Sequence, residues 1–208
     1  MALDTLISQE YEVVCLVTTV PEEIGRTFGH GERTEMIKLQ SEALNIPVHF
    51  IECTYETYTD QFVKTVQTLK HQFHITGIAF GDLYLDEHRE WGEKVADAAS
   101  VEALYPLWMK KGAALQSLDR FVHSGYEAIV IRVREDVLDD TWLGRLIDES
   151  FLLDVQKTTI CPMGESGEYH TFVYDGPLFL KRIQLDQGEL IQLETTKKLE
   201  FKSYHLSE

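Results

Sequence analysis

The first two-thirds of this 208-residue chain alternates short apolar runs with segments of helical period. Tyr11–Val20 (YEVVCLVTTV) is almost continuously apolar and rich in β-branched residues, which predicts a strand buried on both faces. Thr59–Phe73 repeats apolar residues at helical spacing, which predicts a helix packed on a sheet. The other expected elements are helices over Glu32–Asn45, Asp86–Ala99 and Ala113–His123 and strands over Pro47–Cys53, Thr76–Asp82, Ala103–Leu107 and Glu127–Val133. This alternation predicts parallel strands joined by right-handed crossovers.

The pattern changes in the last quarter of the chain, where apolar and polar residues alternate without intervening helices. Tyr169–Tyr174, Phe179–Leu185 and Glu200–His205 predict antiparallel strands, with a turn at Asp186–Gly188. We therefore expect an α/β domain over residues 1–158 and an antiparallel β extension over residues 159–208. An exposed edge of that extension would allow a second subunit to pair, which makes a homodimer one alternative.

Charge and composition exclude several classes of protein. The chain has 35 acidic and 19 basic residues, a net charge of −16, which disfavours binding to a nucleic-acid backbone. No apolar run approaches the length of a membrane span, and the first residues lack the features of a signal peptide. The three cysteines form neither a disulfide framework nor a zinc-type spacing. We expect a cytoplasmic protein with no dedicated metal site.

The segment CPMGESGEYHTFVYDGPLF, which begins at Cys161, concentrates the residues that could carry chemistry. Glycines in a turn let backbone N–H groups approach a ligand closely. Two carboxylates beside them suit a cation such as ammonium, or a proton-transfer role, and a histidine exchanges protons near neutral pH. The residues in question are Gly164, Glu165, Gly167, Glu168 and His170. An equally good interpretation is a tight turn with two solvated glutamates and a histidine on a strand.

GESGEYHTFVYDGPLF closely resembles the GExGEYHT…DGP motif of the diphthine–ammonia ligase (diphthamide synthase) family. Further segments that match the family follow in the same order along the chain, and the resemblance runs from Met1 to about Phe179. These segments are TTV at Thr18–Val20, HGER at His30–Arg33, FGD at Phe80–Asp82, YPLW at Tyr105–Trp108, LGR at Leu143–Arg145 and LIDESFL at Leu146–Leu152.

The resemblance implies a fold, a reaction and a set of ligands. The family is similar to the PP-loop ATP-pyrophosphatases, which implies a doubly wound parallel sheet of the adenine nucleotide alpha hydrolase type. The implied reaction is an ATP-dependent amide-forming ligation, in which a carboxylate is activated as an acyl-adenylate and ammonia then displaces AMP. The implied ligands are ATP with Mg²⁺, ammonia, and the diphthine residue of elongation factor 2.

Carried over to this sequence, the resemblance assigns three groups of residues. Those expected to bind nucleotide are Thr18, His30, Gly31, Arg33, Gly81 and Asp82; those expected to act in catalysis are Glu165, Glu168 and His170; and those expected to bind substrate are Gly164, Gly167, Tyr169, Thr171 and Arg145. Simpler roles compete with some of these. Arg33 could be a helix-surface arginine, Asp82 a helix cap and Arg145 the partner of Glu149 in an ion pair. Asp175-Gly176-Pro177 favours an architectural turn.

One part of the family pattern is absent from this sequence. The family's SGGKDS loop, which belongs between the first strand and the first helix, does not occur, and Met1–Glu10 reads as the end of a helix. We therefore expect a sheet that lacks its first strand. The alternatives are a start further upstream, a fragment, or a relative that binds a nucleotide or a protein without catalysis. A tRNA-modifying PP-loop enzyme is a third class, disfavoured by the charge of −16 and the absence of a CxxC pair.

Overall fold

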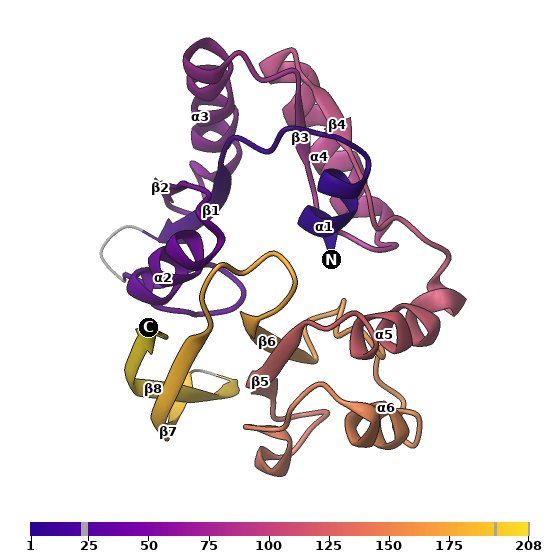
Figure 1. The fold of residues 1–208 in the computed structure, drawn as a ribbon. Helices are drawn as coiled ribbons and strands as arrows, with labels where there is room; N and C mark the ends of the chain where they lie inside the picture. The colour runs from indigo at the N-terminus through magenta and orange to yellow at the C-terminus, as the bar shows by residue number, and fades with distance from the viewer. Residues whose placement is uncertain (22–24, 194, 208) are drawn as a thin grey trace. The chain divides into compact units, whose positions relative to one another are not determined.

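The computed structural model describes residues 1–21, 25–193 and 195–207. The chain divides into two compact units. Unit 1 comprises Met1–Ser41 and Ile46–Lys111, and unit 2 comprises Glu42–Asn45 and Gly112–Glu208. Figure 1 draws the chain from indigo at its start to yellow at its end. None of the described helices is long and apolar enough to cross a membrane.

Unit 1 is built from strands and helices in alternation. Its elements are α1 (Ala2–Ser8), β1 (Leu16–Pro21), α2 (Thr34–Leu44, whose last residues belong to unit 2), β2 (Val48–Cys53), α3 (Tyr58–Phe73), β3 (Gly77–Ala79), α4 (Asp86–Ala99) and β4 (Glu102–Leu104). β1 pairs in parallel with β2 over six residues, and β3 pairs in parallel with β4 over three. Among the described residues no ladder joins β1 to β3, so unit 1 has two short parallel sheets rather than the continuous doubly wound sheet that the resemblance implies.

α3 supplies the core that the two sheets of unit 1 share. Its apolar stripe buries Phe62, Val66 and Leu69, as the helical spacing of these residues predicts. Phe62 and Val66 cluster with Ile51 of β2 and with Val95 of α4, and side chains of β1 and β3 pack against the same cluster. The two sheets therefore keep one hydrophobic core although their strands do not pair.

Unit 2 is dominated by an antiparallel sheet. Its elements are η1 (Lys111–Ala113, at the boundary), α5 (Ala114–Val122), β5 (Glu127–Arg134), η2 (Asp140–Trp142), α6 (Glu149–Val155), β6 (Tyr169–Asp175), β7 (Ile183–Leu193) and β8 (Thr196–Leu206). The strand order is β6-β5-β8-β7, and every pairing is antiparallel. The antiparallel extension expected near the C-terminus is present, and it includes β5.

The expectation that Glu127–Val133 continues a parallel sheet is wrong, because β5 pairs antiparallel with both β6 and β8. Its nearly unbroken apolar run, which is typical of parallel strands, has a local cause. The register with β6 shifts between Val130 and Arg132, and both Val130 and Ile131 are fully buried. A bulge of this kind breaks the alternation of inward and outward side chains.

The turn expected at Asp186–Gly188 is also wrong, because β7 runs through these residues and pairs with β8 on either side. Gln187 adopts a positive φ of 47°, a conformation that turns and strand irregularities share. A Cβ atom on Gly188 would lie 2.6 Å from Leu199 Cδ1. The glycine therefore provides space for a side chain of the neighbouring strand instead of reversing the chain.

Candidate functional site

A cleft of about 1210 Å³ opens within unit 1 beside β1 and β3. Strands of an α/β unit present their carboxyl ends to ligands. Thr18 and Thr19 lie inside β1, and Gly81 and Asp82 follow the end of β3. Four of the six residues expected to bind nucleotide line the cleft, namely Thr18, His30, Gly81 and Asp82; Gly31 and Arg33 are not among its lining residues. The cleft therefore brings together most of the nucleotide-binding residues that the resemblance predicts.

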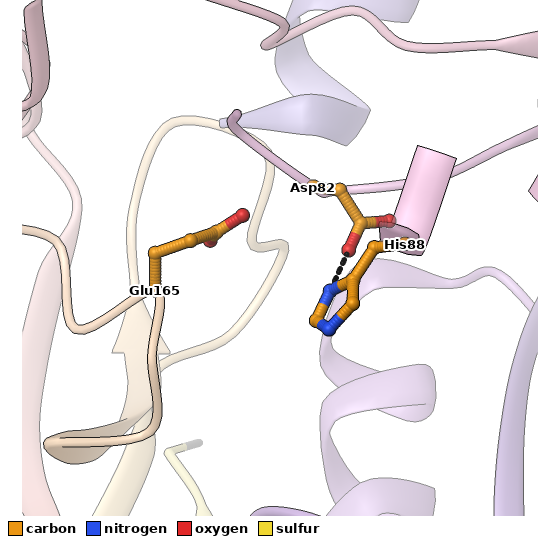
Figure 2. A group of neighbouring side chains, drawn as sticks. All are labelled: Asp82, His88 and Glu165. Carbon is orange, nitrogen blue, oxygen red and sulfur yellow. Dashed lines mark hydrogen bonds and ion pairs between the residues drawn. The ribbon is translucent and has the colours of Figure 1, made fainter. Parts of the chain in front are cut away.

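Asp82 and His88 form a hydrogen-bonded pair at this cleft. His88 Nδ1 lies 2.9 Å from Asp82 Oδ1, as Figure 2 shows. Asp82 follows β3 and His88 lies in the first turn of α4, so the turn between strand and helix sets the pair. Because a carboxylate only accepts, Nδ1 is the donor of this bond. Figure 2 also draws Glu165, which belongs to unit 2.

Aromatic side chains complete the wall of the cleft. Tyr58 and Trp91 line it, and their rings lie 5.6 Å apart. The hydroxyl groups of Tyr58 and Thr19 are 3.2 Å apart, and Trp91 Nε1 donates to Thr59 Oγ1 at 3.0 Å. Burial raises the pKa of the Tyr58 hydroxyl. The site thus presents flat apolar surfaces beside neutral hydroxyl groups, a combination that suits a purine ring and its sugar.

The segment HGER belongs to a tightly bonded loop that leads into α2. Arg26 and Arg33 form an antiparallel bridge, and Arg26 Nη1 donates to the carbonyl oxygen of Gly31 at 3.1 Å. Gly31 has a φ of 63°, a conformation that favours glycine. Glu32 is buried, and its side chain accepts from the backbone N–H of Arg33 at 2.9 Å. The loop geometry therefore accounts for Gly31 without a ligand.

In unit 2, Glu168 closes the Gly-rich segment into a loop. One carboxylate oxygen accepts from the backbone N–H of Cys161 and the other from that of Ser166, each at 3.0 Å. Glu168 is only 7% exposed, so both bonds form away from solvent. Hydrogen bonds from N–H groups to a buried carboxylate are among the stronger ones in proteins. Glu168 is placed to hold the loop in shape, whereas Glu165 lies within the loop.

Tyr169 packs under the same loop. Its hydroxyl donates to the carbonyl oxygen of Pro162 at 2.6 Å, and burial strongly raises the pKa of this hydroxyl. Gly164 has a φ of 66°, and a Cβ atom there would lie 2.8 Å from the carbonyl oxygen of Tyr169. Gly167 also has a positive φ, of 75°. The two glycines expected to bind substrate are therefore required by the loop itself.

His170 lies in a row of basic residues across the sheet of unit 2. It pairs with Arg132 of β5, and Arg132 in turn pairs with Lys198 of β8. Residues directly opposite one another on adjacent strands project from the same face, so the three side chains stand together. Thr171, the next residue of β6, pairs with Val130. Lys198 is fully buried, whereas Arg132 and His170 are partly exposed, so these two basic side chains are the ones that suit an anionic substrate.

Arg145 is held by groups of unit 2. Its Nη2 lies 2.7 Å from Asp154 Oδ2, and its guanidinium lies 4.7 Å from the Trp142 ring and 5.6 Å from the Phe151 ring. Lys157 and, second, Arg145 lower the pKa of Asp154. The ion pair that competes with a substrate-binding role for Arg145 thus forms, but with Asp154 in place of Glu149.

The DGP segment is tied to β5 by a charged network. Arg182 donates to Glu127 at 2.8 and 2.9 Å and to Asp175 at 2.9 Å. The Tyr174 hydroxyl donates to Glu127 at 2.9 Å. Burial and this hydrogen bond raise the pKa of Tyr174 to about 12. These contacts bind the segment to the end of the sheet, as an architectural role requires.

This network predicts a loss of stability at alkaline pH. An unfolded tyrosine releases its proton at about pH 10. The Tyr174 hydroxyl, with a pKa of about 12 in the folded protein, keeps its proton to a higher pH than in the unfolded chain. Its contribution to the stability of the folded state is therefore complete below pH 10 and is lost as the pH rises toward 12. We expect Tyr174→Phe to reduce the fall of the urea midpoint across this range. Tyr55→Phe, at a residue 88% exposed, is the control. An equal fall in wild type and Tyr174→Phe would contradict the prediction.

Sequence reasoning missed His88, Thr19, Tyr58 and Trp91, which line the cleft. A usable signal exists only for His88, a histidine in the first turn of the helix that follows FGD. Tyr58 and Trp91 read as packed residues, because an apolar stripe on a helix does not distinguish a packed face from a ligand-binding wall. Thr19 lies inside β1, next to the predicted Thr18.

Two family models together cover almost all of the chain. The diphthamide synthase N-terminal domain matches residues 1–103, and the diphthamide synthase C-terminal domain matches residues 113–206. The two matches fall on either side of the boundary between the two units.

Curated relatives agree with these matches. The chain is 31% identical over 183 residues to diphthine–ammonia ligase of Danio rerio, covering 80% of this chain and 69% of the relative. It is 29% identical over 186 residues to that of Bos taurus, covering 80% and 66%. It is 27% identical over 207 residues to that of Schizosaccharomyces pombe, covering 89% and 34%. The chain thus spans about two thirds of the first two relatives and one third of the last. It belongs to the diphthamide synthase (diphthine–ammonia ligase) family.

Proposed function

We propose that this chain binds ATP in the cleft of unit 1 and serves an amide-forming ligation of the diphthine–ammonia ligase type. A carboxylate is a poor acyl donor until one of its oxygens becomes part of a good leaving group. ATP supplies that group by adenylation, with release of pyrophosphate. Ammonia then forms the C–N bond as the C–O bond to AMP breaks and a proton leaves the nitrogen.

The observation that carries the nucleotide proposal is the convergence of Thr18, His30, Gly81 and Asp82 on one cleft. These residues come from separate segments of unit 1, and the cleft lies beside parallel strands, where open α/β sheets bind ligands. Trp91 and Tyr58 offer aromatic faces to a base, and the hydroxyl of Thr19 offers a polar contact to a sugar. Family membership supports the same assignment.

The donors at the cleft fit Mg²⁺ accompanying ATP. Mg²⁺ prefers oxygen ligands, keeps several waters and shares the phosphates of its nucleotide. Asp82 lies at the cleft with 24% of its side chain exposed, and its Oδ1 is oriented by His88. We assign Asp82 to the cation, and His88 to the positioning of that carboxylate.

The Gly-rich loop of unit 2 is proposed to handle ammonia and the acyl substrate. Glu165 supplies a carboxylate for ammonium, and His170 is the group suited to accept a proton near neutral pH. Thr171 and the basic row containing His170 provide polar contacts for an anionic substrate. Glu168 acts through the loop, because its two oxygens already accept from backbone N–H groups. The diphthine of elongation factor 2 is the proposed acyl substrate, as the names of the relatives suggest.

Calorimetric titration with Mg-ATP tests the proposal on the full chain. We expect saturable binding that Asp82→Ala weakens by about tenfold or more, equivalent to about 1.4 kcal/mol. Asp97→Ala, at an exposed carboxylate on the far part of α4, is the matched control and should bind as wild type does.

The outcomes separate a ligase from a relative that binds nucleotide without catalysis. Binding followed by AMP release in the presence of ammonia and a diphthine substrate supports a ligase. Binding without AMP release supports a relative that binds nucleotide without catalysis. Failure of the folded protein to bind Mg-ATP, or equal binding by Asp82→Ala, contradicts the nucleotide assignment.

A further inference from the structure

The segment that follows β4 is bonded to the loop that carries Asp82. This loop, residues 80–85, joins β3 to α4. Phe80 N–H donates to the carbonyl oxygen of Leu104 at 2.9 Å, and Met109 N–H donates to the carbonyl oxygen of Leu83 at 2.8 Å. One bond lies before Asp82 and the other directly after it. The segment from Leu104 to Met109 therefore holds the loop on both sides of Asp82.

Tyr105 adds side-chain contacts to the same loop and to α4. Its ring stacks on that of Phe80, with centroids 5.4 Å apart and planes inclined by 22°. Its hydroxyl donates to the carbonyl oxygen of Arg89 at 2.8 Å. Arg89 follows His88, the residue whose ring is hydrogen-bonded to Asp82. Tyr105 thus connects the first residue of the loop to the helical turn that orients the Asp82 carboxylate.

Gly92 provides the space that Tyr105 occupies against α4. It is buried in the interior of the helix, where glycine is less favourable than alanine. A Cβ atom there would lie 2.2 Å from the Tyr105 hydroxyl oxygen and 3.0 Å from Phe80 Cε2. The glycine therefore allows both rings to approach the helix closely.

Arg89 and Trp108 brace Tyr105 from the other side. The Arg89 guanidinium lies 5.2 Å from the centre of the Tyr105 ring and 4.9 Å from that of Trp108, and its Nε donates to Glu93 at 2.8 Å. Burial, and after it the charges of Glu93 and Asp82, raise the pKa of Tyr105. The hydroxyl therefore remains protonated at neutral pH, as the bond to Arg89 requires.

We propose that Tyr105 is a positioning residue that holds the 80–85 loop so that Asp82 can bind the Mg²⁺ accompanying ATP. Groups that orient a metal ligand commonly affect metal affinity without touching the metal. Tyr105 is not among the residues that line the cleft, so it acts through Phe80 and Arg89. This inference rests on the proposed nucleotide binding and gives the YPLW segment a role in it.

A double-mutant cycle with Asp82 tests this role by calorimetric titration of the full chain with Mg-ATP. We expect Tyr105→Leu, which removes the ring and the hydroxyl, to weaken binding by about tenfold. In the Asp82→Ala background the same substitution should change the affinity by less than about twofold, because the carboxylate that Tyr105 positions is absent. Tyr105→Phe keeps the ring on Phe80 and should lose less affinity than Tyr105→Leu.

Amide hydrogen exchange tests the loop without nucleotide. In Tyr105→Leu, exchange at the amides of Phe80 and Met109 should become about tenfold faster, while the amides of β2 change less. Gly92→Ala should have the same effect by displacing Tyr105, although alanine favours the helix. Adding Tyr105→Phe removes the clashing hydroxyl and should partly restore slow exchange in the Gly92→Ala chain.

A core truncation elsewhere in unit 1 controls for a general loss of stability. Val63→Ala alters a side chain that packs against the core cluster and does not line the cleft, so the folded variant should bind Mg-ATP as wild type does. Equal weakening by Tyr105→Leu with and without Asp82, no weakening at all, or unchanged exchange at Phe80 and Met109 would overturn the inference. If wild type does not bind Mg-ATP, the proposed function fails, and the exchange measurement alone decides whether Tyr105 holds the loop.

Discussion

Gly176→Ala is expected to destabilise unit 2 by about 3 kcal/mol or more, at the upper end of the cost of overpacking a core. A Cβ atom on Gly176 would lie 2.0 Å from Cδ1 and 2.8 Å from Cγ of Tyr126. Cγ lies on the axis of the ring flip, so rotation about the Cβ–Cγ bond alone cannot remove the clash. Tyr126 is buried and its ring stacks on that of Phe121 at 6.4 Å. Amide exchange in β5 gives a measure of stability specific to unit 2.

Two variants make the Gly176 prediction decisive. Gly112→Ala is the matched control, because a Cβ atom there meets no heavy atom within 4 Å, and it should leave exchange in β5 unchanged. Tyr126→Leu removes the clashing ring, so the cost of Gly176→Ala should shrink in the double variant, which a double-mutant cycle measures. A cost of Gly176→Ala below about 1 kcal/mol would show that the turn yields easily, and that its glycine is not architectural.

Local patterns predicted the helices well because amphipathic spacing is a property of one segment. The prediction for Asp86–Ala99 is confirmed over its full length, and that for Thr59–Phe73 differs by one residue at its start. A helix satisfies its own hydrogen bonds, so its limits depend mainly on nearby residues. His74 and Ser100, which end α3 and α4, both adopt the left-handed conformation without being glycine, so neither helix end carries a glycine signal.

Strand partners were harder to predict because they depend on distant segments. The apolar run of β5 is compatible with a parallel neighbour or with an antiparallel one, and its bulge hides the alternation that would have favoured the second. Gly188 was misread for a related reason, since a glycine near a polar pair is typical of a turn. Its actual requirement comes from Leu199 on the adjacent strand, which no local pattern encodes.

In the candidate site, too, some residues could be predicted from the local sequence, whereas others depend on packing between distant segments. Asp82, which follows β3, could be predicted from position, because parallel strands place their carboxyl ends at one edge, whereas Thr18 lies in the middle of β1. His88 and Tyr58 reach the cleft from helices, and their contribution depends on how α3 and α4 pack. The distinction between Glu165 and Glu168 depends on which backbone N–H groups the loop presents, and the sequence alone cannot show this.

Glu168→Ala is expected to release the Gly-rich loop and to destabilise unit 2 by roughly 3 kcal/mol or more. The substitution removes two buried bonds to a carboxylate, each worth about 1.5–3 kcal/mol, and leaves the N–H groups of Cys161 and Ser166 without that acceptor. Loop rearrangement and entering water would recover part of the loss. Exchange at these two amides should become fast in the variant, while the amides in the middle of β8 should change only through the global loss of stability.

Graded substitutions separate a positioning role for Glu168 from a catalytic one. Glu168→Gln retains one carbonyl oxygen, so it should preserve protection at one of the two amides and lose less stability than Glu168→Ala. Glu165→Gln, in the same loop, should leave the amides of Cys161 and Ser166 protected. If ligase activity is measured, a positioning role predicts that the loss of activity in each Glu168 variant parallels the loss of exchange protection at the loop amides. Retained protection at both amides in Glu168→Ala would show that other contacts hold the loop, and would return Glu168 to the candidates for proton transfer.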